Sequence, residues 1–167
     1  MPTYKPIGVI RSPHTRAENV PIQPVYARGI RGRVELLAEY EAGLRDLEGF
    51  SHIHLIYEFH QAAAPRLEVV PFLGKEARGI FATRAPSRPN PLGLSLVHLL
   101  GREGAVLHIE DVDILDGTPL LDIKPYVGRF DSREGARCGW QDEIDEETAR
   151  QRGRRGWRGP DDSGGAG

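Results

Sequence analysis

The sequence lacks the cysteines for an internal disulfide and the long apolar runs of membrane-spanning or signal segments. Its 167 residues include a single cysteine, Cys138, which excludes an intrachain disulfide. No stretch approaches the roughly 18 consecutive apolar residues of a membrane-spanning helix. The first residues, Met-Pro-Thr-Tyr-Lys, lack the apolar run of a secretory signal peptide. The sequence therefore predicts a soluble, cytoplasmic protein without membrane association.

A dominant charge of either sign is also absent. Lys and Arg number 22 against 24 Asp and Glu, which leaves a net charge of −2 at pH 7. This balance argues against a strongly electrostatic nucleic-acid binder, although a local basic patch can still bind RNA. With 39% hydrophobic and 28% charged residues, a chain of 167 residues is long enough for one hydrophobic core but not two.

Few long segments show the apolar spacing of an amphipathic helix. Most of the chain has the pattern of short strands separated by Gly and Pro. The alternation of apolar and polar residues predicts strands at 4–10, 32–37, 50–60, 94–100, 106–109 and 120–124. Apolar residues at spacings of four and three predict one short amphipathic helix over residues 38–47. The predicted fold is mostly β: a single compact β-barrel over residues 1–127, followed by an irregular, partly disordered extension over residues 128–167.

A proline-rich loop is the most distinctive local feature. Three prolines within residues 84–92 lack an amide donor and disfavour helix in the residue before each of them. We therefore expect an ordered, extended loop that carries Arg84 and Arg88. Because its backbone entropy is already restricted, such a loop holds guanidinium groups towards a ligand at low cost. This favours a ligand-binding loop over a plain connector.

Histidines occur on the polar face of the strand predicted over residues 50–60. His52, His54 and His60 share that face, but side chains along a strand spread too far for all three to meet at one tetrahedral ion. We therefore expect no metal there. His60, followed by Gln61, ends the strand where ligand pockets commonly begin. It is either a ligand contact or a hydrogen-bonded strand-end histidine.

Acidic residues gather before and after a Gly-Thr-Pro turn. Asp113 and Asp116 lack the spacing of a calcium loop, and Asp116 would more simply fix the strand end through backbone amides. A carboxylate here could instead accept a hydrogen bond from a ribose hydroxyl or an ammonium group. Asp122, Lys124 and Tyr126 follow on one strand face, either as a surface ion pair beside an aromatic ring or as part of a site.

The end of the chain is rich in arginine. Five arginines and Trp157 fall within residues 150–158, a composition compatible with RNA backbone contact and base stacking. A solvated tail is the alternative, and residues 142–151 could form a charged helix. If the segment binds RNA, we expect its removal to leave small-ligand binding by the barrel unchanged.

Several motifs in succession resemble the TsaA-like family, formerly the uncharacterised YaeB family. They are IGVIRSP at residues 7–13, FSH at 50–52, FHQ at 59–61, the loop over 82–95, DGTP at 116–119 and DIKPY at 122–126. Characterised members are TrmO enzymes, which methylate N6 of threonylcarbamoyladenosine beside the tRNA anticodon. They use S-adenosylmethionine bound on a β-barrel. The resemblance covers approximately residues 4–126.

This resemblance implies a set of site residues. The implied S-adenosylmethionine contacts are Pro21, Ile22, Gln23, His60, Gln61, Arg84, Leu94, Asp113, Ile114, Leu115, Asp116 and Gly117. The candidates for a base, or for a hydrogen bond that draws electron density towards N6, are Asp116, Asp122, Lys124 and Tyr126. The resemblance also implies a tRNA substrate and a homodimer in which a neighbour's loop completes the site.

One departure from the family leaves alternatives open. Longer members carry a substantial second domain, whereas about forty residues follow Tyr126 here. The alternatives are a methyltransferase with another substrate and a module that binds S-adenosylmethionine without turnover. In none of these do we expect a metal ion, because the sulfonium donor needs no Lewis acid.

Overall fold

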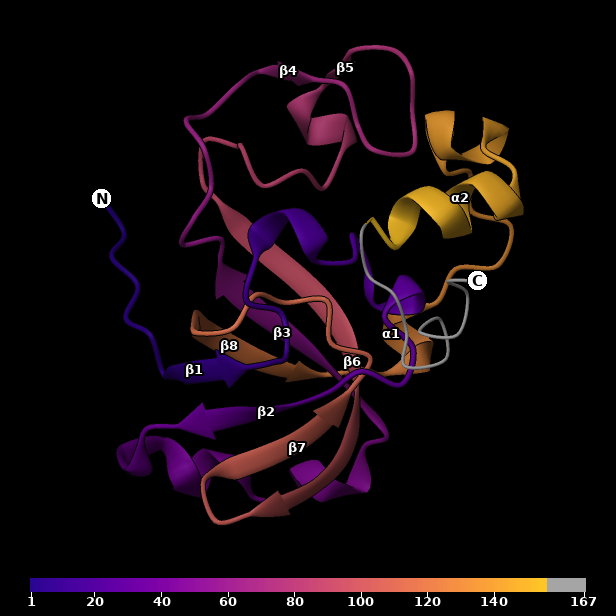
Figure 1. The fold of residues 1–167 in the computed structure, drawn as a ribbon. Coiled ribbons are helices and arrows are strands. Elements are labelled where there is room, and N and C mark those ends of the chain that lie inside the picture. Colours follow the sequence, from indigo (N-terminus) through magenta and orange to yellow (C-terminus); the bar gives the residue numbers. More distant parts are fainter. Residues whose placement is uncertain (156–167) are drawn as a thin grey trace, which may run out of the picture.

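Six antiparallel strands close into a barrel (Figure 1). The computed structural model describes residues 1–155, and the strands follow the order β1-β2-β7-β6-β3-β8, with β8 paired back onto β1. Their bounds are Gly8–Arg11 (β1), Arg31–Leu36 (β2), His52–Glu58 (β3), Leu92–Glu103 (β6), Val106–Glu110 (β7) and Thr118–Pro125 (β8). The predicted mostly-β barrel is confirmed.

The alternation along each strand places apolar side chains inside the barrel. On β3, Ile53 and Leu55 are fully buried and Tyr57 is 4% exposed, while the residues between them face outwards. Burial of each such side chain contributes about 1.5–3 kcal/mol relative to exposure. The buried core cluster consists of Ile10, Val34, Leu44, Ile53, Leu55, Tyr57, Val97, Leu99, Leu107, Ile109, Val112, Ile114 and Leu120. Every strand of the barrel thus contributes to one core.

The first strand is shorter than predicted, because β1 starts at Gly8 rather than at residue 4. Residues 4–6 are exposed, and Pro6 has no amide to donate to a strand ladder. The other five predicted strands are present with shifted ends. The hairpin formed by β6 and β7 is also as predicted.

The amphipathic helix predicted over residues 38–47 is not one continuous helix. Two short 3-10 helices, η3 (Ala38–Leu44) and η4 (Leu47–Gly49), occupy this stretch. Asp46 separates them with a left-handed backbone, φ 69°. A residue in that conformation cannot continue a right-handed helix, so the run is broken after its buried residue, Leu44.

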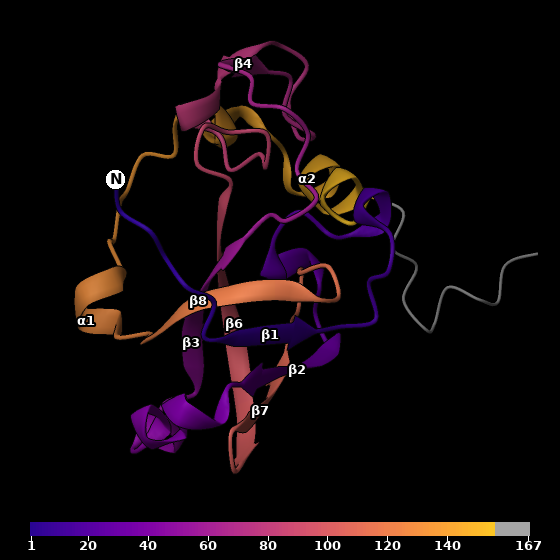
Figure 2. The same cartoon turned by 90° about the vertical axis from the view of Figure 1, so that its left-hand side faces the viewer.

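The long connection from β3 to β6 extends over one end of the barrel (Figures 1 and 2). It contains the short strands β4 (Glu68–Val69) and β5 (Arg78–Gly79), which pair with each other, and then η5 (Ile80–Ala82). The β1–β2 connection, with η1 (Ala17–Asn19) and η2 (Pro24–Tyr26), also contributes to this end of the molecule.

The proline-rich loop that follows lacks regular structure, as predicted, but it is bent rather than extended. The amide of Arg88 donates to the carbonyl of Pro86 at 2.8 Å. The Arg88 guanidinium donates to the carbonyl oxygens of Thr83 and Ala85 at 3.0 and 3.2 Å. Arg88 therefore holds the loop together from within.

The C-terminal extension contains short helices, and one of them overlaps the charged helix predicted over residues 142–151. It contains α1 (Gly128–Asp131), η6 (Gly139–Glu143) and α2 (Glu146–Gly153). Asp145 caps α2 by accepting from the Thr148 amide at 2.8 Å. Trp157, Arg158 and the end predicted to be disordered lie outside the described residues. No helix within residues 1–155 combines the length and the apolar character needed to cross a bilayer.

A close approach on β6 generates a stability prediction. A Cβ atom on Gly93 would lie 2.2 Å from the ring of Tyr57, whereas one on Gly101 would meet nothing within 4 Å. Gly93→Ala should therefore lower the free energy of unfolding by about 1–3 kcal/mol through overpacking. Gly101→Ala, the matched control, should change it by less than about 0.5 kcal/mol. Urea denaturation measures both, and equal losses would contradict the contact.

Candidate functional site

A chain of buried polar groups lies inside one end of the barrel. The Ser95 hydroxyl donates to the Asp113 carboxyl at 2.6 Å, and the Tyr57 hydroxyl lies 2.9 Å from the Ser95 hydroxyl. Tyr57, Ser95 and Asp113 are 4%, 1% and 7% exposed. Because the one hydroxyl proton of Ser95 goes to Asp113, the Tyr57 hydroxyl is the donor to Ser95. The three groups form a directed chain that ends on a carboxyl.

Burial controls the ionisation of Tyr57 and Asp113, the two end groups of this hydrogen-bonded series. It raises the pKa of Asp113 to about 7, while the Ser95 hydrogen bond and the Arg84 charge act in the opposite direction. Burial also raises the pKa of Tyr57 well above its usual value. Tyr57 is therefore neutral at physiological pH, and Asp113 changes its charge near neutrality.

Arg84 connects the proline-rich loop to the β1–β2 connection. Its guanidinium donates to the Gln23 side-chain oxygen at 2.9 Å, and its charge partly opposes the rise that burial causes in the pKa values of Asp113 and Tyr57. Arg84 itself is exposed. Two implied cofactor contacts from segments far apart in the sequence, Gln23 and Arg84, are thus bonded to each other, and the Arg84 charge acts on a third, Asp113.

The connection between β7 and β8 carries Asp113, and the segment after β1 holds it in place. The His14 ring bonds to the Val112 carbonyl at 2.7 Å, and the Ser12 hydroxyl donates to the Ile114 carbonyl. His14 is 3% exposed, and burial lowers its pKa below the usual value. These bonds fix the backbone on both sides of Asp113.

Asp116 follows in the same connection and has a structural partner. Its carboxylate accepts from the Ser12 amide at 3.1 Å and lies 4.0 Å from the Arg11 guanidinium. Gly117 next to it adopts φ 79°, which favours glycine. The interpretation of Asp116 as a carboxylate that fixes the strand end through a backbone amide is therefore confirmed.

The remaining candidate catalytic residues lie on the outer wall of the barrel. Asp122 and Lys124 form an ion pair at 3.1 Å. Asp122 and Leu94 both pair with Ile56, one from each side of β3, so these two candidates lie on the same sheet face.

Tyr126 lies towards the opposite end of β3 from the Arg84 loop. Its ring packs against those of His52 and His54, with centroids 6.5 and 5.9 Å apart. The seven residues of β3 span roughly 20 Å. Tyr126 is therefore not brought together with Arg84 and Asp113 within this chain.

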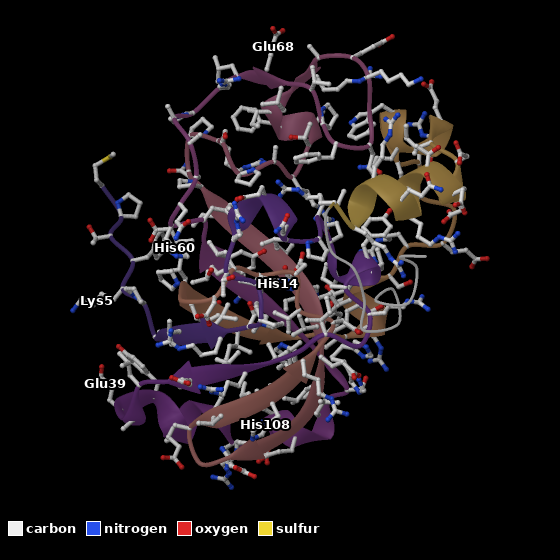
Figure 3. All side chains as sticks on the ribbon, viewed as in Figure 1. Lys5, His14, Glu39, His60, Glu68 and His108 are labelled. Atoms are coloured by element: carbon white, nitrogen blue, oxygen red, sulfur yellow. The ribbon has the colours of Figure 1, made fainter. Side chains whose placement is uncertain are left out.

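His60 and Gln61 are also separate from the buried polar chain. Both are exposed in the segment after β3, and Figure 3 shows His60 at the edge of the molecule while His14 lies near its centre. Within residues 1–155, no side-chain hydrogen bond joins His60 or Gln61 to Gln23, Arg84 or Asp113. The remaining implied contacts, Pro21, Ile22, Ile114 and Leu115, are buried or half-buried neighbours of Gln23 and Asp113 in the chain.

Sequence reasoning missed three residues of this site. Ser95 carried a usable signal, because it is a polar residue at a core-facing position of an otherwise apolar strand. Tyr57 lies on the apolar face of its strand, where its ring fits the pattern and its hydroxyl gives no periodic signal. His14 lies in an aperiodic segment, so only the tertiary structure shows its bond to Val112.

Other features of the described residues do not form a comparable site. Within residues 1–155, no group of three or more His, Cys, Asp or Glu side chains could hold a metal ion. Cys138 is a free, exposed thiol.

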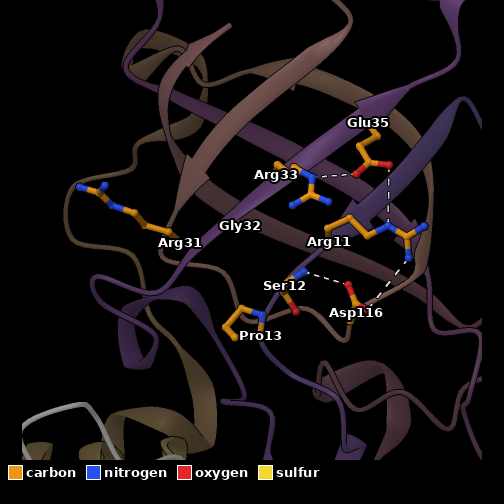
Figure 4. Close-up of a pocket in the computed structure, with 8 residues that line it drawn as sticks. All are labelled: Arg11, Ser12, Pro13, Arg31, Gly32, Arg33, Glu35 and Asp116. Atoms are coloured by element: carbon orange, nitrogen blue, oxygen red, sulfur yellow. Dashed lines mark hydrogen bonds and ion pairs between the residues drawn. The ribbon is translucent and has the colours of Figure 1, made fainter. Parts of the chain in front are cut away.

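An open pocket of about 700 Å³ lies against β1 and β2 (Figure 4). Its lining residues are Arg11, Ser12, Pro13, Arg31, Gly32, Arg33, Glu35 and Asp116. The charges there are largely paired, since Glu35 lies 3.7 Å from Arg11 and 2.7 Å from Arg33. Asp116 is the only implied site residue in that lining, so we place the candidate site at the Arg84 end instead.

Comparison with known sequences identifies relatives over most of the chain. The family described as the tRNA-methyltransferase O N-terminal domain matches residues 9–132. A Pyrococcus abyssi protein named a probable S-adenosyl-L-methionine-binding protein is 57% identical over 137 residues, covering 82% of this chain and 74% of that protein. The Escherichia coli tRNA (adenine(37)-N6)-methyltransferase is 41% identical over 135 residues, covering 74% of this chain but only 57% of the enzyme.

Solved structures agree with the sequence comparison. A crystal structure of TrmO superposes with a TM-score of 0.73 at 43% identity, covering 83% of this chain and 64% of that one. A TrmO structure from Pseudomonas aeruginosa gives a TM-score of 0.71 at 41% identity, covering 84% and 62%. This chain thus spans less than two thirds of either solved chain.

The buried carboxyl generates a prediction of pH dependence. The folded-state pKa of about 7 for Asp113 exceeds the ordinary 3.8, so the folded state holds this proton more tightly than the unfolded state. The stability from this group is complete below about pH 4 and is lost as the pH rises through 7. Relative to the Asp113→Asn variant, the free energy of unfolding of the unaltered protein should fall by on the order of 2–3 kcal/mol between pH 5 and pH 8.

Urea denaturation of both chains at several pH values measures this difference. His14 titrates in the unaltered protein and in the Asp113→Asn variant alike, so its contribution cancels in the difference between their unfolding free energies. A difference between the two chains that does not vary with pH would contradict the raised pKa of Asp113.

Proposed function

This chain belongs to the family of the tRNA-methyltransferase O N-terminal domain, and from that we propose that it is an S-adenosylmethionine-dependent methyltransferase acting on N6 of threonylcarbamoyladenosine beside the tRNA anticodon. The observation that carries the proposal is the hydrogen bond between Arg84 and Gln23, two implied cofactor contacts from distant segments, with the Arg84 charge acting on the buried Asp113. Relatives named as S-adenosylmethionine-binding proteins and as a tRNA methyltransferase support it.

The chemistry of these side chains fits S-adenosylmethionine. Arg84 uses one N–H on Gln23 and retains others for a carboxylate such as that of the methionine portion. The Gln23 amide nitrogen remains a donor, and the Asp113 carboxyl can accept from a ribose hydroxyl or an ammonium group. Leu94, 46% exposed, offers apolar surface nearby on the outer wall. We propose that the backbone of residues 21–22 and 114–117 also contacts S-adenosylmethionine, as do His60 and Gln61.

The main role of the protein is then to position the methyl donor and the acceptor nitrogen. S-adenosylmethionine, when bound, supplies a methyl group already activated on a sulfonium. Loops held by internal bonds, such as those of Arg88, orient the side chains that bind the donor, and this lowers the entropic part of the barrier. Asp116, Asp122, Lys124 and Tyr126 remain the candidates for a hydrogen bond or base at the acceptor nitrogen. Asp122 is well placed, because it shares an outer face with Leu94.

A homodimer would bring the separated residues together. Tyr126 lies too far along β3 to reach the Arg84 loop of its own chain. Large apolar side chains are exposed beside that loop, with Phe81 at 75%, Leu92 at 42% and Leu94 at 46%. We propose that the outer wall of β6, β3 and β8 meets the Arg84 end of a second copy. The barrel domain over residues 1–127 would form this dimer, with 128–167 as its extension, in the cytoplasm where tRNA is found.

A second candidate is favoured by the names of the relatives. The Pyrococcus abyssi protein is named only for probable S-adenosylmethionine binding, and a Methanothermobacter thermautotrophicus protein, 42% identical over 128 residues, is named in the same way. Binding without turnover, or methylation of another substrate, is therefore the alternative.

Two measurements distinguish these functions. Calorimetry in the presence of a chelator should show S-adenosylmethionine binding, because none of the proposed contacts requires a metal. Mass spectrometry of tRNA nucleosides from a deletion strain should show loss of methylated threonylcarbamoyladenosine. An unchanged nucleoside profile with intact binding would replace the proposed reaction by the second candidate, and binding only after addition of a divalent ion would contradict the contacts themselves.

Two arginines of one loop form a matched pair for mutagenesis. Arg84→Ala should weaken S-adenosylmethionine binding by about tenfold or more, as expected for the loss of a charge-assisted bond, and leave the melting temperature nearly unchanged. Arg88→Ala should lower the melting temperature, because it removes the bonds to Thr83 and Ala85. Calorimetry and thermal melts separate the two effects. A collapse in the stability of Arg84→Ala that matches its loss of binding would make Arg84 a structural residue.

A further inference from the structure

One part of the C-terminal extension contacts both loops that carry the proposed cofactor contacts. We define residues 139–155 as the C-terminal clasp. We propose that the clasp is a positioning element, which holds residues 20–26 and 72–84 in the relative arrangement that binds S-adenosylmethionine. This inference rests on the proposed function and adds to it a role for a segment outside the barrel.

The first contact of the clasp is with the loop that carries Gln23. The Ile22 amide donates to the carbonyl of Gly153, the last residue of α2, at 2.9 Å. Gly153 is buried, and a Cβ atom there would come within 2.3 Å of the Tyr26 ring. The end of α2 is therefore packed directly on η2, and Figure 1 shows α2 beside the β1–β2 connection. This contact fixes the backbone next to Gln23.

The second contact is with the loop that leads to Arg84. The Trp140 indole N–H donates to the Ala82 carbonyl at 2.8 Å, two residues before Arg84. The Arg78 guanidinium lies over the Trp140 ring, 5.8 Å from its centroid. The clasp is thus attached to the backbone on the approach to Arg84.

Arginines of the clasp extend this second contact. Arg152 donates to the Leu73 carbonyl at 3.4 Å, and the Arg155 guanidinium lies 4.3 Å from the centre of the Phe72 ring. Burial lowers the pKa of Arg155, which fits a cation packed against the protein rather than extended into solvent. Within the described residues, the arginine-rich segment is therefore not a separate tail, and its removal should not leave the cofactor site unchanged.

The geometry explains why the proposed site needs such an element. The bond between Arg84 and Gln23 joins two loops that lie outside the barrel strands, and a displacement of about 1 Å would break it. The eight residues of α2 are too few to form a stable helix alone, so α2 is held by the surfaces it joins. The clasp and the two loops therefore order one another.

Point variants of the full chain test this role. Trp140→Phe removes the donor to Ala82 but keeps an aromatic ring beneath Arg78, and Gly153→Ala forces α2 away from Tyr26. In calorimetry, each should raise the dissociation constant for S-adenosylmethionine by about three- to tenfold. Arg150→Gln, the control, breaks only the exposed ion pair with Glu147 and should change it less than about twofold. Unchanged affinity in both clasp variants would overturn the proposal.

A double-mutant cycle separates positioning from general stabilisation. If the clasp acts through Arg84, then Trp140→Phe should have almost no further effect on affinity in an Arg84→Ala background. Equal effects of Trp140→Phe in both backgrounds would overturn the positioning role. Failure of the unaltered chain to bind S-adenosylmethionine at all would instead overturn the proposed function, and this is seen before any variant is made.

Discussion

The hydrogen bond from Ser95 to the buried carboxyl of Asp113 is the interaction on which the site depends. A carboxyl taken out of water is costly unless it is protonated or hydrogen-bonded, and here the Tyr57–Ser95 chain supplies the partner. The closed barrel makes that burial possible, because Ser95 and Tyr57 project inwards from neighbouring strands. The β7–β8 connection can enter the barrel end only because His14 and its neighbours satisfy its backbone carbonyls.

The loops around this buried group form a second layer with a different physical basis. Besides buried apolar residues such as Leu73 and Ile80, hydrogen bonds to backbone carbonyls order these loops, as with Arg88 inside the proline-rich loop and Trp140 across to Ala82. Such bonds specify direction at modest net energy. The barrel thus supplies most of the stability, and the geometry of the loops, more than their stability, decides what the site can bind.

Prediction from the sequence succeeded where a repeating constraint acts on many residues. Alternation along β3, β6 and β7 identified the strands and the barrel, because an incorrect register would expose the core. It failed over residues 38–47, where apolar spacing suggested one helix and the left-handed backbone of Asp46 divides two 3-10 turns. A single backbone angle leaves no periodic trace in a sequence.

The sequence by itself determined a mostly-β barrel, a rigid arginine-bearing loop and, through its motifs, a family. Only the tertiary structure showed that Arg84 bonds to Gln23, that Asp113 is buried and bonded to Ser95, that Tyr126 lies far from the Arg84 loop, and that residues 139–155 join the two loops. The physical reason is one of range. Periodicity and proline chemistry act between near neighbours, whereas the burial of a carboxyl and the meeting of two loops depend on residues far apart in the chain, which only the closed barrel brings together.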